Sequence, residues 1–190
     1  MHVTAPELPL GFDAGDEQAS DRPVLQFLRF SLGAEAYAVR IELVREILEV
    51  SQMTPLPLMP AFVRGVMNLR GAVVPVVDLA ARLGMSATEI GRRSCVIMVD
   101  MVLPEGLGHQ SLGVLVDAVH EVFDIEEGGV EPVPRMGTRI DPSLIAGMVR
   151  VRGQVIPALD FERSLAQQAL SELISAHLNK GGVDAVAAAV

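Results

Sequence analysis

Two glutamates and two arginines recur at matching places along the chain and could form ion pairs. Glu46 lies in VREILEV (44–50), and Glu121 lies in VHEVFDI (119–125). Arg70 and Arg152 each precede a glycine, in GVMNLRGAVVPVVDL and GMVRVRGQVIPALDF. Because a guanidinium can grip a carboxylate through two parallel hydrogen bonds, we expect Glu46 to pair with Arg70, and the second acid and arginine to mirror that pair. The alternative is that these side chains are solvated and contribute at most about 1 kcal/mol where they meet.

The two arginine-containing stretches align along their whole length. Matching Gly65 with Gly147 also pairs Arg70 with Arg152, Gly71 with Gly153, Val73 with Val155, Pro75 with Pro157 and Asp78 with Asp160. Glycine takes the positive φ of a tight hairpin turn, proline suits a sheet edge because it donates no ladder hydrogen bond, and aspartate caps a following helix. We infer two halves of one plan, each with two strands, an acidic V-x-E segment, an R-G hairpin and a strand ending in Asp.

The elements that must position these residues are mostly short strands. Runs rich in β-branched residues and bounded by Gly, Pro or Asp predict a mainly β fold, a small barrel or a sandwich. Brief helical segments are expected at 41–47, 79–83 and 142–145, each too short to be stable without tertiary contacts. The fold is expected to begin near Val24.

The two ends of the chain differ from its centre. Residues 1–23 lack hydrophobic periodicity and are expected to be a flexible N-terminal segment. From Asp160, apolar residues recur every three or four positions, which predicts an amphipathic helix that ends near Lys180. Residues 181–190 are expected to form a frayed tail.

Composition excludes several classes of function. The chain has 190 residues, of which 50% are hydrophobic, and its apolar runs are shorter than the roughly 20 residues of a membrane span. A net charge of −9 disfavours nucleic acid and anionic membranes as partners. The four histidines and single cysteine show no metal-ligand spacing, and phosphate-binding loops and nucleophile motifs are missing, so we expect no metal and no cofactor. The sequence indicates a cytoplasmic binding protein rather than an enzyme.

A rival interpretation is a small β-barrel hydrolase with a pocket between the two halves. Two carboxylates from the set Glu46, Asp78, Glu121 and Asp160 would then serve as acid and base across that pocket. The surrounding residues favour helix caps for the two aspartates, because each leads into an expected helix.

Five stretches carry a family likeness. FLRFSLGAEAYAV (27–39), VREI (44–47), PAFVRGVMNLRGAVVPVVDL (60–79), LGVLVDAVHEV (112–122) and GMVRVRGQVIPALD (147–160) resemble the bacterial chemotaxis coupling protein CheW family. The likeness spans about residues 24 to 175. It implies a domain over residues 24–180 with two small five-stranded β-barrel subdomains side by side, short helices and a C-terminal amphipathic helix.

The resemblance also implies a function. Members of the family are non-catalytic adaptors that join the cytoplasmic tip of a chemoreceptor to the regulatory domain of a CheA-type histidine kinase, at membrane-associated receptor arrays. The same role in a non-swimming pathway, such as type IV pilus control or surface sensing, is the alternative. The positions that match the family's coupling residues are Val44, Glu46, Asn68 and Arg70, whereas Glu121 and Arg152 match a looser part of the family pattern. We add Ile47, Met67, Gly71 and Val114 as candidate coupling residues. Our hypothesis is a cleft between the halves, lined by Val44, Ile47, Met67 and residues near Val114, with Arg70 at its rim.

Overall fold

Ten short strands make up most of the chain that the structure describes. The structure is a computed structural model, and it describes residues 23–102, 109–134 and 137–165. The strands are β1 (Val24–Leu32), β2 (Glu35–Arg40), β3 (Val44–Glu49), β4 (Val63–Leu69), β5 (Ala72–Asp78), β6 (Cys95–Val102), β7 (His109–Val116), β8 (Ala118–Glu126), β9 (Ile145–Val151) and β10 (Gln154–Leu159). The helical segments are η1 (Ile41–Leu43), α1 (Leu79–Arg82), η3 (Glu127–Gly129), η4 (Pro142–Leu144) and α2 (Phe161–Leu165). The predicted mainly β fold is confirmed.

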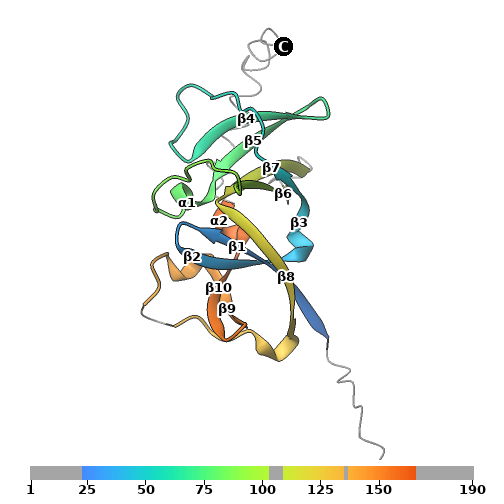
Figure 1. The fold of residues 1–190 in the computed structure, drawn as a ribbon, viewed down its shortest axis with the longest axis vertical. Helices are drawn as coiled ribbons and strands as arrows, with labels where there is room; N and C mark the ends of the chain where they lie inside the picture. Colours follow the sequence, from blue (N-terminus) through green and yellow to red (C-terminus); the bar gives the residue numbers. More distant parts are fainter. Residues whose placement is uncertain (1–22, 103–108, 135–136, 166–190) are drawn as a thin grey trace, which may run out of the picture.

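The strands form two five-stranded sheets with the same internal plan. Sheet A has the order β8-β1-β2-β10-β9, and sheet B has the order β3-β6-β7-β5-β4. Sheet B occupies the upper part of Figure 1 and sheet A the lower part. In each sheet one parallel pairing, β2 with β10 or β7 with β5, joins strands that are otherwise antiparallel. Strand for strand, β1 and β2 of sheet A therefore correspond to β6 and β7 of sheet B, and β8, β9 and β10 correspond to β3, β4 and β5.

The two sequence halves exchange strands between the two sheets. The first half of the chain supplies β1 to β5 and the second half supplies β6 to β10, and each set of five strands is followed by a short helix, α1 or α2. Sheet A combines β1 and β2 of the first half with the last three strands of the second half, and sheet B does the reverse. Neither half therefore builds a sheet alone, and the halves meet twice in each sheet, at the parallel pairing and at the antiparallel pairing of β1 with β8 or of β6 with β3.

The described residues form three hydrophobic clusters, of which only the central one joins the two sheets. The central core contains residues from both sheets, such as Phe30 and Val114, while smaller cores lie on the inner face of sheet A and of sheet B. The run Cys95–Val99 in β6 shows why the inner strands are apolar throughout. Ile97 belongs to the central core, but its neighbour Val96 belongs to the core of sheet B. Strands buried on both faces lose the alternation of polar and apolar residues.

The predicted barrels are five-stranded sheets that hydrogen-bonded strand pairing does not close. In the described residues, one isolated bridge per sheet pairs the chain beyond one edge strand with the other edge strand. Thr54, after β3, pairs with Val66 of β4, and Glu131, after β8, pairs with Met148 of β9. The backbone bonds of the first bridge measure 2.8 and 2.9 Å from nitrogen to oxygen. A Cβ on Gly65, whose φ is +132°, would lie 2.2 Å from the carbonyl oxygen of Thr54, so the bridge between Thr54 and Val66 requires glycine at position 65.

Gly147 in β9 has the corresponding role in sheet A. A Cβ there would lie 2.4 Å from Val130 Cγ1 and 3.1 Å from the carbonyl oxygen of Glu131. The first glycine of the sequence repeat is thus explained by the close approach of a loop to an edge strand in both sheets.

The short helices agree with the sequence analysis except in one place. The helix expected over 41–47 is wrong after Leu43, because Val44–Glu49 pairs with β6 as strand β3. Asp78 Oδ1 accepts from the Ala81 amide at 3.1 Å, and Asp160 Oδ1 accepts from the Arg163 amide at 2.9 Å, which confirms the predicted caps.

Other predictions concern parts of the chain that the structure does not describe. The helix expected to continue to Lys180, the N-terminal segment before residue 23 and the tail 181–190 lie outside the described residues. In the described part of the chain, no helix is both long and apolar enough to cross a membrane.

Candidate functional site

Both Arg-Gly hairpins are two-residue turns in which the arginine itself has a left-handed backbone. The φ angles are +53° at Arg70 and +88° at Gly71, and +48° at Arg152 and +78° at Gly153. Positive φ at both central positions is the type I′ signature, for which Asn-Gly or Gly-Gly are the favoured sequences. An arginine in this conformation costs on the order of 1 kcal/mol. The sequence analysis assigned the strain to glycine alone, although a two-residue hairpin imposes it on both residues.

The two predicted ion pairs are present. Arg70 Nη2 lies 3.4 Å from Glu46 Oε2, and Arg152 contacts the carboxylate of Glu121. The arginine side chains are 80% and 72% exposed, respectively. Exposed pairs of this kind stabilise a fold by at most about 1 kcal/mol, so they do no more than offset the turn strain. Folding alone therefore gives little reason to keep arginine in either turn.

A bulge in the edge strand of each sheet turns the glutamate inward. In sheet B, Val44 pairs with Val99 and Glu46 pairs with Met98, so Arg45 is the extra residue. Val44 thus packs against the central core, while Met98, opposite Glu46, belongs to the core of sheet B. The register between β8 and β1 shifts at the corresponding step, beside Glu121.

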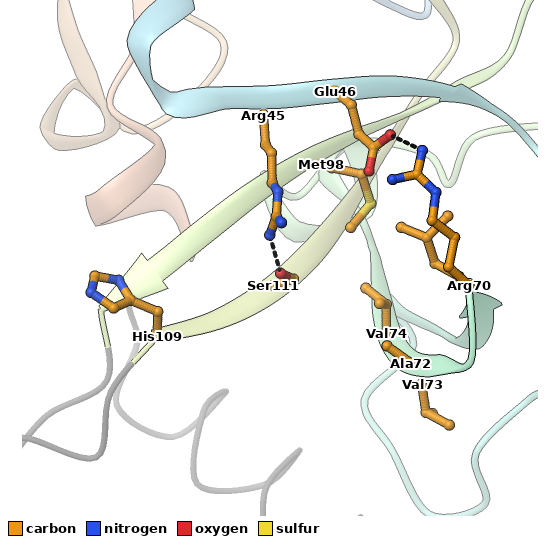
Figure 2. A pocket seen from close by; sticks show the side chains of 10 residues that line it. Arg45, Glu46, Arg70, Ala72, Val73, Val74, Met98, His109 and Ser111 are labelled. Carbon is orange, nitrogen blue, oxygen red and sulfur yellow. Dashed lines mark hydrogen bonds and ion pairs between the residues drawn. The ribbon is translucent and has the colours of Figure 1, made fainter.

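Glu46 and Arg70 stand at the edge of a pocket that we call the sheet-B mouth. The pocket has a volume of about 440 Å³ and lies between β3 and the β4–β5 hairpin, over β6 and β7. In Figure 2, Glu46 and Arg70 approach each other on one side, and Arg45 reaches toward Ser111 on the other, with Met98 between them. The remaining lining residues are Leu69, Ala72, Val73, Val74 and His109. The mouth therefore has an apolar wall and a charged rim.

The rim opposite Arg70 is held by a second acid–arginine pair. Arg45 Nη1 lies 3.2 Å from Asp100 Oδ1, and Ser111 Oγ donates to the same oxygen at 2.8 Å. The Ser111 hydroxyl, and after it Arg45, lower the pKa of Asp100. Asp100 is thereby kept charged, and Arg45 is tethered at this side of the mouth.

The equivalent mouth of sheet A contains an arginine side chain. Arg29 in β1 takes the place that Met98 has in β6, and Gln154 in β10 takes the place of Ala72 in β5. Arg29 Nη1 donates to Glu121 Oε1 at 3.3 Å, and Arg29 Nη2 donates to Gln154 Oε1 at 3.2 Å. The sequence analysis missed Arg29, and its signal is a charged residue inside the apolar run FLRF.

The structure divides the predicted coupling residues among three environments. Glu46 and Arg70 line the sheet-B mouth, and Asn68 Oδ1 accepts from the Gly71 amide at 2.9 Å, which supports the Arg70-Gly71 turn. Ile47 is 41% exposed and pairs with Ile97 of the central core, so it lies on the opposite face of β3 from Glu46.

Two residues of the hypothesised cleft are buried instead. Met67 is 4% exposed and Val114 is 0% exposed, because β4 and β7 turn them into the sheet-B core and the central core. They cannot line an open cleft, and Val44 packs partly against the same central core as Val114. Met67 therefore does not line a cleft with Val44 and Ile47 as hypothesised, and Val114, beside which the cleft was placed, is itself in the core.

The four carboxylates of the hydrolase interpretation all have structural partners. Asp78 is fully buried and accepts from the Thr88 amide at 2.8 Å, in addition to its cap on α1. Asp160 caps α2, and both glutamates are paired with arginine. Among the described residues, no group of three or more His, Cys, Asp or Glu side chains is arranged to hold a metal ion.

The comparison with protein families identifies the fold. The family model for the CheW-like domain matches residues 26–169, which include strands of both sheets. The chain belongs to the CheW-like family. The Chemotaxis protein CheW of Rhizobium meliloti (strain 1021) is 34% identical over 137 residues, covering 72% of this chain and 84% of that protein.

Two further proteins extend the comparison. Protein FrzA of Myxococcus xanthus is 32% identical over 149 residues, covering 77% of this chain and 89% of that protein. The crystal structure of the scaffolding protein TtCheW from Thermoanaerobacter tengcongensis aligns with a TM-score of 0.67 and 33% sequence identity, covering 76% of this chain and 94% of that chain. The CheW-like assignment thus has support from sequence and from structure.

Proposed function

We propose that this chain is a non-catalytic scaffold that couples the cytoplasmic tip of a chemoreceptor to the regulatory domain of a CheA-type histidine kinase. The family assignment supports this role, as do relatives named chemotaxis protein CheW and a structural neighbour described as a scaffolding protein. The proposed scaffold acts in the cytoplasm and reaches the membrane only through its partners. It requires neither nucleic acid nor a cofactor.

The observation that carries the proposal is the conformation of Arg70. Its backbone is left-handed and its side chain is 80% exposed at the edge of an open pocket. Strained residues persist where the surrounding structure holds them for a function. Asn or Gly would relieve the strain, and the pair with Glu46 stabilises the fold only slightly. Arg152 has the same strain, so the open pocket beside Arg70 is what distinguishes the two turns, and we infer that Arg70 contacts a partner there.

A scaffold that joins two proteins needs two surfaces that do not overlap, and β3 offers one on each face. Glu46 turns into the sheet-B mouth beside Arg70, whereas Ile47 is exposed on the opposite face. A partner that buries Ile47 in an apolar contact would gain binding affinity there. The charged rim of the sheet-B mouth would fix the orientation of a bound partner.

The test uses purified chain, a receptor cytoplasmic fragment and a CheA-type kinase, with binding and kinase activation measured separately. Arg70→Asn is expected to weaken receptor pull-down and kinase activation, because it removes the guanidinium while favouring the hairpin turn. Arg152→Asn is the matched control, since it makes the same change in the same kind of turn on sheet A. Unchanged coupling by Arg70→Asn would contradict the proposed role.

The same coupling role in a pathway other than swimming is the second candidate. The likeness to Protein FrzA of Myxococcus xanthus favours it, because this relative carries a name other than CheW. Deleting the gene and comparing swimming in soft agar with migration on a surface distinguishes the two. Loss of swimming alone supports the first candidate, and loss of surface migration alone supports the second.

A further inference from the structure

The two mouths are built from equivalent strands and equivalent hairpins, yet Arg29 crosses the sheet-A mouth from Glu121 to Gln154, whereas the equivalent positions of the sheet-B mouth hold Met98 and Ala72. Arg29 lies opposite Ala38, and Met98 lies opposite Gly113, with a bulge in the neighbouring edge strand at the same step. We propose that the sheet-B mouth receives an arginine side chain from a protein partner, in the place that Arg29 occupies in the sheet-A mouth. This inference rests on the proposed coupling function and specifies what the partner contributes.

The two glutamates differ in how much of their hydrogen-bonding capacity is used. Glu121 contacts two guanidiniums, those of Arg29 and Arg152. Among the described residues, Glu46 contacts only the guanidinium of Arg70, at 3.4 Å. A carboxylate has about four lone-pair sites, so Glu46 can accept a second guanidinium as Glu121 does.

The shape and lining of the sheet-B mouth suit a long side chain with a charged end. At about 440 Å³ it falls within the range of ligand pockets in proteins. Leu69, Val74 and Met98 form an apolar wall against which the methylene stem of an arginine would pack. The planar guanidinium would meet Glu46 at the rim, where its fork of donors matches a carboxylate better than the ammonium of lysine does.

An acidic side chain is the rival occupant, because arginines also line the mouth. Each of these arginines already has a carboxylate partner: Arg45 pairs with Asp100, and Arg70 pairs with Glu46. An acidic side chain would have to compete with those partners, whereas a cationic one would add to Glu46 the contact that Arg29 makes with Glu121. The observations therefore favour arginine.

A first experiment measures the pocket directly on the full chain with labelled methionine methyl groups. Titration with Nα-acetyl-arginine amide is expected to shift the Met98 methyl resonance, and Glu46→Gln is expected to abolish that shift. Nα-acetyl-glutamate amide is the charge-reversed probe and is expected to leave Met98 unshifted. A larger response to the glutamate probe, or an arginine response that survives Glu46→Gln, would overturn the proposal.

A second experiment places opposite charges at Ala72, which is exposed at the start of β5 and lines the mouth. Ala72→Lys puts a competing cation beside Glu46 and is expected to weaken coupling about tenfold or more, as expected for one charged hydrogen bond. Ala72→Glu has the same position and the opposite charge, and it is expected to strengthen coupling, because it offers the partner's guanidinium a second carboxylate. The opposite ranking would show that the occupant is acidic.

The two proposals can fail separately in this design. If both Ala72 variants couple normally while Arg70→Asn does not, the scaffold role stands and the arginine inference is wrong. If Arg70→Asn also couples normally, the sheet-B mouth is not the coupling surface, and both proposals fall.

Discussion

The sheet-A and sheet-B mouths share a strand order, a bulge, a strained Arg-Gly turn and a glutamate–arginine pair, yet one is filled and the other is open. In sheet A, Arg29 crosses the mouth from Glu121 to Gln154. In sheet B, the equivalent positions hold Met98 and Ala72, which leave a pocket. The difference teaches that the side chains at two equivalent positions decide whether the glutamate is held by a second guanidinium of its own chain or has room for one from outside.

The two isolated bridges, Thr54 with Val66 and Glu131 with Met148, sharpen this comparison, and glycine substitutions beside them have the largest expected effect. Gly65→Ala would place a methyl group 2.2 Å from the Thr54 carbonyl oxygen at a φ of +132°. We expect it to lower the free energy of unfolding by about 2–4 kcal/mol, because neither backbone can give way. Gly147→Ala meets mainly the Val130 side chain, and about 1–2 kcal/mol is expected. Urea unfolding of both variants measures the difference, and an equal loss would contradict it.

Arg29→Met gives the sheet-A mouth the methionine that the sheet-B mouth has at the equivalent position. Arg29 is 20% exposed and donates to two side chains, so its loss is expected to lower the free energy of unfolding by about 1–2 kcal/mol. Arg70→Met removes a solvated guanidinium and is expected to cost no more than about 1 kcal/mol. Chemical denaturation of both variants tests whether Arg29 stabilises the fold and Arg70 does not. A larger loss for Arg70→Met would reverse this assignment.

Replacing either turn arginine by asparagine is expected to change stability little. The substitution relieves about 1 kcal/mol of strain in a type I′ turn and removes an exposed ion pair of similar size. Melting temperatures of Arg70→Asn and Arg152→Asn should therefore lie close to that of the unsubstituted chain. A large drop for either would mean that the arginine holds the hairpin together.

The smallest effect concerns the pairs beside the two bulges. Sheet B has Arg45 with Asp100, whereas sheet A has His120 Nε2 at 3.1 Å from Ser31 Oγ. Because the pKa of Asp100 is lowered in the folded chain, its contribution to stability is present above about pH 4 and is lost as the pH falls through the lowered value. Asp100→Asn is expected to lower the free energy of unfolding by a few tenths of a kcal/mol at neutral pH and to leave it unchanged in strong acid. Urea unfolding at both pH values measures this, and a difference that persists in acid would exclude Asp100 ionisation as its cause.

The residue types alone predicted the sequence repeat, the two ion pairs and the helix caps. They did not show how the strands of the two halves pair. Short-range signals such as Arg70-Gly71 and the cap at Asp78 depend on neighbouring residues, so the sequence predicts them well. The exchange of strands depends on parallel pairings between distant segments, such as Ala158 with Ala38, which periodicity does not reveal. The burial of Val114 was missed for the same reason, because a strand covered on both faces shows no alternation.

The most direct test compares the two mouths in one complex. Amide resonances of Arg70–Gly71 and Arg152–Gly153 are recorded while the receptor fragment and the kinase regulatory domain are added in turn. The account predicts that at least one partner shifts the resonances at the sheet-B turn and that neither shifts those at the sheet-A turn. Equal shifts at both turns, or shifts at Arg152–Gly153 alone, would contradict the claim that the open mouth of sheet B is the coupling surface.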